Sequence, residues 1–131
     1  MRGVLFMAHS GVRYLVLLSA VVAIVYLITA LRRSPDRTSN RVMSIFTGMV
    51  DLQVLLGLLT LITVPFYGAL AGHIMMMFAA VFVGHGFVIA NRQRPADQQS
   101  NGRLLVGVVI TLALIIGGIL AIGRPIIGTG A

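Results

Sequence analysis

Four long apolar stretches, joined by short connections, constrain this chain more than any other feature of its sequence. They span roughly residues 4–31, 42–64, 73–90 and 104–122. Each is close to the ~20 residues that an α-helix needs to cross ~30 Å of hydrocarbon. A helix also satisfies its own backbone hydrogen bonds in lipid, which an isolated strand cannot do. We therefore predict an all-α, integral membrane four-helix bundle that forms a single transmembrane domain.

The composition leaves little charge to cover a water-soluble surface. The chain of 131 residues is 58% hydrophobic and 10% charged, its mean hydropathy is +1.01, and it contains no lysine and no glutamate. Soluble domains carry about 25% charged residues, so we expect the lipid bilayer to surround most of the surface. Because cysteine is also absent, disulfides, thiolate metal sites and covalent c-type haem attachment are excluded.

The basic residues gather in two of the three connections. The first and third connections hold Arg32, Arg33, Arg37, Arg41, Arg92, Arg94 and Arg103. The second, at residues 65–68, has no charge. By the positive-inside rule, the basic connections face the cytoplasm and both termini lie outside. Since short connections join antiparallel neighbours, the bundle runs up and down. Topology thus accounts for the formal charge of +7, and we expect no nucleic-acid partner.

Two histidines are expected near the outer surface on different helices. His9 lies about 7 Å into the first helix, and His73 opens the third. Two imidazoles from two helices are what a six-coordinate b-type haem needs at its iron. Arg13 lies one turn deeper than His9 on the same face, where it could pair with a haem propionate. The alternative is that both histidines are structural residues that simply find hydrogen-bond partners.

A second polar level is expected deeper in the bundle, because Asp51 and His85 come to similar depths by the helix rise. Ionisable groups within a membrane mark either tight pairing or function. Asp51 could form a structural pair with Arg13 or with His85, or could have a proton-linked or quinone-linked role. Gln53 is predicted to pack or to hydrogen-bond beside it.

The fourth helix has no ionisable residue between Arg103 and Arg124, and small residues recur along it at Ala113, Gly117 and Ala121. Small residues at this spacing let helices approach closely. They could pack within the bundle or dock against a partner protein, and the sequence leaves both alternatives open.

Short motifs in the first three helices resemble a known family. The residues are His9-Ser-Gly-Val-Arg13, Asp51-Leu-Gln53, His73-Ile-Met-Met and His85-Gly. They are similar to a family of short bacterial four-helix membrane proteins, some of which are labelled cytochrome b-like. The chain departs from the family pattern at Tyr14, where tryptophan is expected, and at Gly72 and Ile74, which stand where glutamate and proline would flank His73. The resemblance implies a location in the bacterial inner (cytoplasmic) membrane.

Three functions remain as hypotheses. The first is a redox-associated membrane protein, not an enzyme, that holds one b-type haem between His9 and His73 and works with a haem and quinone system. The second is a non-catalytic accessory subunit of a larger respiratory or photosynthetic complex, with other membrane subunits as partners. The third is a small transporter or a proton-linked channel that uses Asp51 and His85, although the chain shows no inverted repeat of the transporter type.

Overall fold

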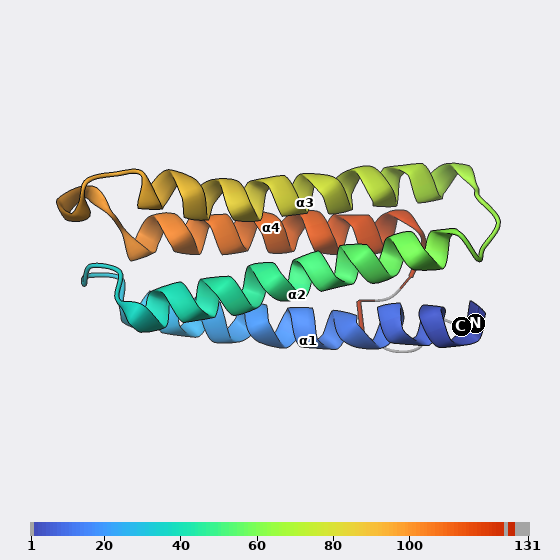
Figure 1. Ribbon diagram of the computed structural model, residues 1–131, viewed down its shortest axis with the longest axis horizontal. Coiled ribbons are helices and arrows are strands. Elements are labelled where there is room, and N and C mark those ends of the chain that lie inside the picture. Colours follow the sequence, from blue (N-terminus) through green and yellow to red (C-terminus); the bar gives the residue numbers. More distant parts are fainter. Residues whose placement is uncertain (1, 125, 128–131) are drawn as a thin grey trace.

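The computed structural model, which describes residues 2–124, 126 and 127, is a bundle of long antiparallel helices (Figure 1). Helices α1 (Arg2–Thr29) and α2 (Arg37–Leu61) form one hairpin, and α3 (Gly68–Arg92) and α4 (Asn101–Ala121) form the other. A short 3-10 helix, η1 (Ala96–Gln98), lies between α3 and α4. Each of the four α-helices is long and apolar enough to cross a membrane, which agrees with the predicted all-α, four-helix architecture.

The two ends of the bundle differ in chemistry. The connections at residues 30–36 and 93–100 lie together at one end, here called the basic end (Figure 1). The connection at residues 62–67 lies at the other, here called the Tyr67 end, together with the start of α1 and the end of α4 (Figure 1). The arginine-rich connections therefore share one end of the bundle, as the sequence pattern requires.

All four helices begin earlier than their apolar stretches predict, and three of them begin earlier by three residues or more. Helix α2 begins at Arg37 instead of residue 42, α3 at Gly68 instead of 73, and α4 at Asn101 instead of 104. Capping explains two of these extensions, because it stabilises polar first turns that an apolar criterion leaves out. Asp36 and Ser39 form a reciprocal capping box at the start of α2, and the Ser100 hydroxyl accepts a hydrogen bond from the Arg103 amide at the start of α4. Helices α1 and α2 end at Thr29 and Leu61, before the expected ends at 31 and 64.

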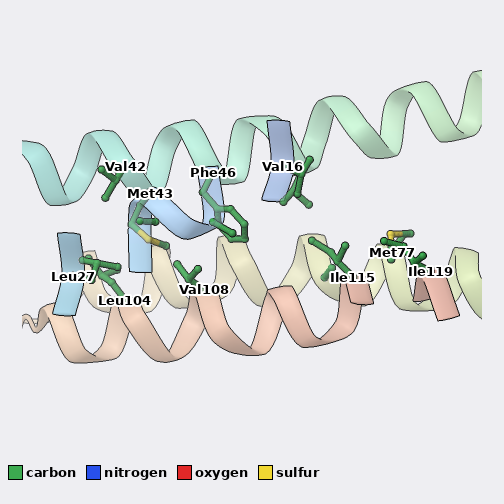
Figure 2. Packing of buried hydrophobic residues seen from close by; sticks show 14 residues of the cluster. Val16, Leu27, Val42, Met43, Phe46, Met77, Leu104, Val108, Ile115 and Ile119 are labelled. Carbon is green, nitrogen blue, oxygen red and sulfur yellow. The ribbon is translucent and has the colours of Figure 1, made fainter. Parts of the chain in front are cut away.

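The closely packed core lies in the half of the bundle toward the basic end. Phe46, Leu27 and Leu104 are almost completely buried there, with side chains from three helices (Figure 2). Met77, Ile115 and Ile119 continue the cluster toward the Tyr67 end, where the helices enclose a cavity instead of a filled core. The two halves therefore differ in packing, and the cavity between the helices lies in the half toward the Tyr67 end.

Close contact between α3 and α4 depends on glycines. A Cβ added at Gly107 would lie 2.6 Å from the Cβ of Phe87, and one at Gly118 would lie 2.5 Å from the Cε of Met77. Gly117 packs in the same way against Met76, so this member of the predicted small-residue stripe serves packing within the bundle. Ala113 and Ala121 stay exposed.

A buried asparagine connects the two hairpins at the basic end. The side-chain amide of Asn101, at the start of α4, donates to the carbonyls of Ala30 at 2.8 Å and Arg33 at 3.0 Å, just beyond α1. Its oxygen accepts a hydrogen bond from the Ser39 hydroxyl of α2 at 2.7 Å. One fully buried side chain thus joins α4 to α2 and to the connection that follows α1, because its amide can donate and accept at the same time.

Candidate functional site

A cavity of about 680 Å³ lies between the four helices and reaches the Tyr67 end. Its volume is in the range of small-molecule and cofactor sites. Most of its wall is apolar, formed by residues such as Val16, Val54 and Ile115. The polar side chains that line it include His9, Ser10, Arg13, Gln53, Thr60, His73 and Arg124. A largely apolar wall with a few polar groups is typical of a site that binds and orients an apolar ligand.

His9 is fixed in the cavity wall by a reciprocal pair of hydrogen bonds to α2. Its Nδ1 lies 3.1 Å from the carbonyl oxygen of Gln53, and the Gln53 amide donates to the His9 carbonyl at 2.7 Å. One turn further along α2, Gly57 leaves room for the ring, since a Cβ there would lie 3.0 Å from the Cε1 of His9. Gln53 thus hydrogen-bonds to His9 in the cavity wall, whereas the sequence pattern grouped it with Asp51.

His73 enters the same cavity from α3. It does not open its helix, as the apolar stretch predicted, because α3 begins one turn earlier at Gly68. Its Nδ1 lies 2.8 Å from the carbonyl oxygen of Gly118 in α4. The absence of a side chain at Gly118 brings the backbone of α4 close to α3, and this brings the carbonyl within reach of the imidazole.

The imidazole rings of His9 and His73 lie next to each other, with centres 6.4 Å apart and planes at 84°. In each ring, Nδ1 faces a backbone carbonyl. A carbonyl can only accept, so Nδ1 carries the proton and Nε2 keeps its lone pair. Metal-binding histidines usually show this arrangement, in which one ring nitrogen donates to a carbonyl and the other faces the metal.

The separation of the rings fits two ligands of one metal ion. A metal–imidazole bond is about 2 Å long and the ligating nitrogen lies roughly 1 Å from its ring centre, so two imidazoles that shared one metal ion would have ring centres at most about 6 Å apart. The observed 6.4 Å is close to this limit. Across the described part of the chain, no group of three or more histidine, cysteine or acidic side chains could hold a metal ion, and the cavity wall contains the two histidines His9 and His73.

Two arginines line the cavity. Arg13 is 6% exposed and lies one helical turn from His9, and its Nη2 donates to the Tyr14 hydroxyl at 3.0 Å. The guanidinium of Arg124 lies 4.5 Å from the centre of the Phe6 ring, and Arg124 also belongs to the cavity wall. Guanidinium and carboxylate groups form strong hydrogen bonds, so these are the two side chains of the cavity wall that could bind a carboxylate.

Asp51 and His85 form a separate pair outside the cavity. The Nε2 of His85 lies 2.9 Å from both carboxylate oxygens of Asp51, and neither residue lines the cavity. Of the two structural partners that the sequence allowed for Asp51, the structure therefore shows His85 and not Arg13. The two polar levels expected from helix rise are both present, one inside the cavity and the other at the junction of α2 and α3.

Comparison with known proteins finds no matching family model, no matching curated protein and no matching solved structure. The fold and the cavity together define an all-helical bundle with a largely apolar cavity, in whose wall two histidines lie next to each other. The function must therefore be inferred from this geometry.

Proposed function

We propose that this chain is a multi-pass membrane protein that holds one b-type haem between His9 and His73 and serves in membrane electron transfer. The single observation that carries the proposal is the pair of imidazoles, 6.4 Å apart in the wall of a large apolar cavity. A haem held there would supply one-electron chemistry. The residues of the chain would bind it, orient it and keep water from it.

The membrane setting is supported by the helices and by the charge distribution. All four helices have the length and composition of membrane spans, and exposed large apolar side chains occur along the whole bundle. The arginine-rich connections share the basic end, which the positive-inside rule assigns to the cytoplasm of a bacterial inner membrane. The termini and the Tyr67 end then face outward, and the proposed haem lies in the outer half of the bilayer.

Each residue of the site has a distinct part in this proposal. His9 and His73 would ligate the iron through Nε2, because their Nδ1 atoms face the carbonyls of Gln53 and Gly118. Such outer partners fix the orientation of a ligating imidazole and raise its basicity. Arg13 and Arg124 would bind the propionates. The apolar wall would favour the macrocycle over water.

An accessory-subunit function is the alternative from the sequence, and the structure offers less for it. Gly117, the centre of the small-residue stripe on α4, packs against Met76 inside the bundle. A partner that docks on α4 would have to use the exposed side chains near Ala113 and Ala121.

The absorption spectrum of the purified full-length chain, produced in membranes with an ample supply of haem, tests the proposal. We expect a Soret band and the narrow α-band of a six-coordinate b-type haem. His9→Gly and His73→Gly should each lose the six-coordinate spectrum, and added imidazole should restore it in both. His85→Gly removes a histidine outside the cavity and is the matched control, so its spectrum should be unchanged.

Two outcomes would contradict haem ligation by this pair. One is a wild-type protein that stays colourless under these conditions while its circular dichroism shows a folded helical bundle. The other is a six-coordinate spectrum that persists when His9 and His73 are replaced together.

A further inference from the structure

The Asp51–His85 pair is arranged as a base that a carboxylate orients. A carboxylate can only accept hydrogen bonds, so the His85 Nε2 that faces both oxygens at 2.9 Å carries the proton. In its neutral form, the imidazole then keeps its lone pair on Nδ1. In the same way, the acid of a catalytic triad fixes the tautomer of its histidine. The Nδ1 atom of His85 is therefore a hydrogen-bond acceptor for a ligand that carries a donor.

The pair opens to the outside of the bundle. The side chains of His85 and Asp51 are 43% and 46% exposed, and α2 and α3 touch each other much less than the two helices within either hairpin do. Asp51 is near the middle of α2, so in the membrane of the proposed function both side chains are reached from the hydrocarbon. Ionisable residues in such positions usually face the interior of a bundle, and an outward-facing pair points to a ligand that arrives through the lipid.

The surroundings of the pair suit a flat ring. Phe82 lies one turn before His85 on α3, on the same side of the helix, and is 75% exposed. Gly48, one turn before Asp51, and Gly86, next to His85, have no atoms within 4 Å of an added Cβ. An exposed aromatic ring thus lies one turn from the pair, and another ring could stack on it.

We propose that Asp51 and His85 form a binding site for the head group of a lipid-soluble hydroquinone. One phenolic O–H donates to the His85 Nδ1, the ring packs on Phe82, and the isoprenoid tail stays in the lipid. Phospholipid head groups stay at the membrane surface and fatty acyl chains carry no donor, so neither suits this acceptor near the middle of the membrane. The site depends on the membrane setting of the proposed function and does not depend on the haem.

Nitrogen NMR of the full chain in lipid nanodiscs tests this site. The chain has only three histidines, so a sample labelled with ¹⁵N-histidine gives few imidazole signals, which single substitutions assign. Titration with decyl-hydroquinone should shift the Nδ1 signal of His85 in a saturable way. The dimethyl ether of the same compound, which lacks O–H donors, should bind at least tenfold more weakly.

Variants separate a specific site from general partitioning into lipid. Asp51→Asn should weaken the binding about tenfold, because an amide can donate to Nε2 and so favours the other tautomer. Phe82→Leu should weaken it less, since only stacking is lost. His73→Gly should leave the His85 response unchanged, whether or not the protein holds haem, so failure of the haem proposal would not be mistaken for failure of this one.

Three results would overturn the proposal. The first is the absence of a saturable shift at His85. The second is a saturable shift at His9 or His73 instead, which would place the ligand in the cavity. The third is a His85 signal that responds to the protein-to-lipid ratio and not to hydroquinone, which would mean that a second copy of the chain covers the pair.

Discussion

Asp36 is the residue that organises the turn between α1 and α2. Its carboxylate accepts hydrogen bonds from the Tyr26 hydroxyl at 2.7 and 2.6 Å and from the Ser39 amide at 2.8 Å. These donors favour the charged form of the carboxyl group. The Tyr26 hydroxyl, followed by the Ser39 amide, lowers the pKa of Asp36 from its ordinary 3.8 to about 2. A single side chain thus caps one helix and holds the end of another.

The pH dependence of stability follows from this lowered pKa. Since the folded pKa is below the unfolded one, the contribution of Asp36 is fully present above about pH 4 and is lost as pH falls toward 2. Carboxyl ¹³C NMR should show Asp36 titrating near pH 2, and Tyr26→Phe should raise its pKa toward 3.8. Tyr67→Phe, which removes a hydroxyl at the other end of the bundle, should leave it unchanged. A wild-type Asp36 that already titrates at its ordinary value would contradict this assignment.

At the scale of helices, α3 and α4 pack closely because glycines such as Gly107 leave room for the side chains of the other helix. The Cβ of an alanine at position 107 would meet the Cβ of Phe87 at 2.6 Å. An atom so close to the backbone cannot swing away, so the two helices must move apart. This differs from Gly118, where the atom that would be met is the flexible Cε of Met77.

We therefore expect Gly107→Ala to lower the free energy of unfolding by about 1–3 kcal/mol, the usual cost of overpacking. Gly72→Ala on α3 is the control, because nothing lies within 4 Å of its added Cβ. The control should stabilise slightly, since alanine is the better helix former by about 0.5–1 kcal/mol. Denaturant unfolding in one detergent, followed by circular dichroism, measures both. Equal stability of the two variants would show that the close approach at Gly107 is not needed.

For the whole molecule, the four-helix architecture followed from the length and spacing of the apolar stretches, because a span of lipid fixes the length of a helix. Helix rise also gave the depths of His9 and His73 well enough to bring the two residues together. It could not choose between Arg13 and His85 as partner of Asp51, because α2 packs against both α1 and α3 and depth says nothing of the side of α2 on which Asp51 lies. That choice required the side-chain contacts, in which Asp51 meets His85 of α3.

Other features of the structure could not be predicted from the pattern of apolar residues. The partners of the two cavity histidines are backbone carbonyls of Gln53 and Gly118, and every residue has such a carbonyl. Arg124 stood out in the sequence only as a charge beyond the fourth helix. Asn101 precedes the apolar stretch at 104–122, so the apolar pattern places it in a connection. Ser100 is a good N-cap residue, and this signal predicts a helix that begins at Asn101.

Asn101 is also the residue through which the stability of the whole bundle can be tested, since it joins the two hairpins where α2 and α4 begin. Asn101→Ala would leave the carbonyls of Ala30 and Arg33 without this donor and the Ser39 hydroxyl without this acceptor. Loss of partners by buried polar groups costs about 1–3 kcal/mol, and we expect the free energy of unfolding to fall by that amount. Asn40→Ala, at an exposed position of α2, should change it little.

Asn101→Asp separates the hydrogen bond that Asn101 accepts from those that it donates. A carboxylate can still accept from Ser39 but cannot donate to the two carbonyls, and its charge would be buried. It should therefore be at least as destabilising as Asn101→Ala, even though it is nearly the same size. If unfolding in one detergent showed Asn101→Asp to be as stable as the wild type, the amide donors would not be what holds the end of α1 against α4, and the hairpins would be joined by apolar packing alone.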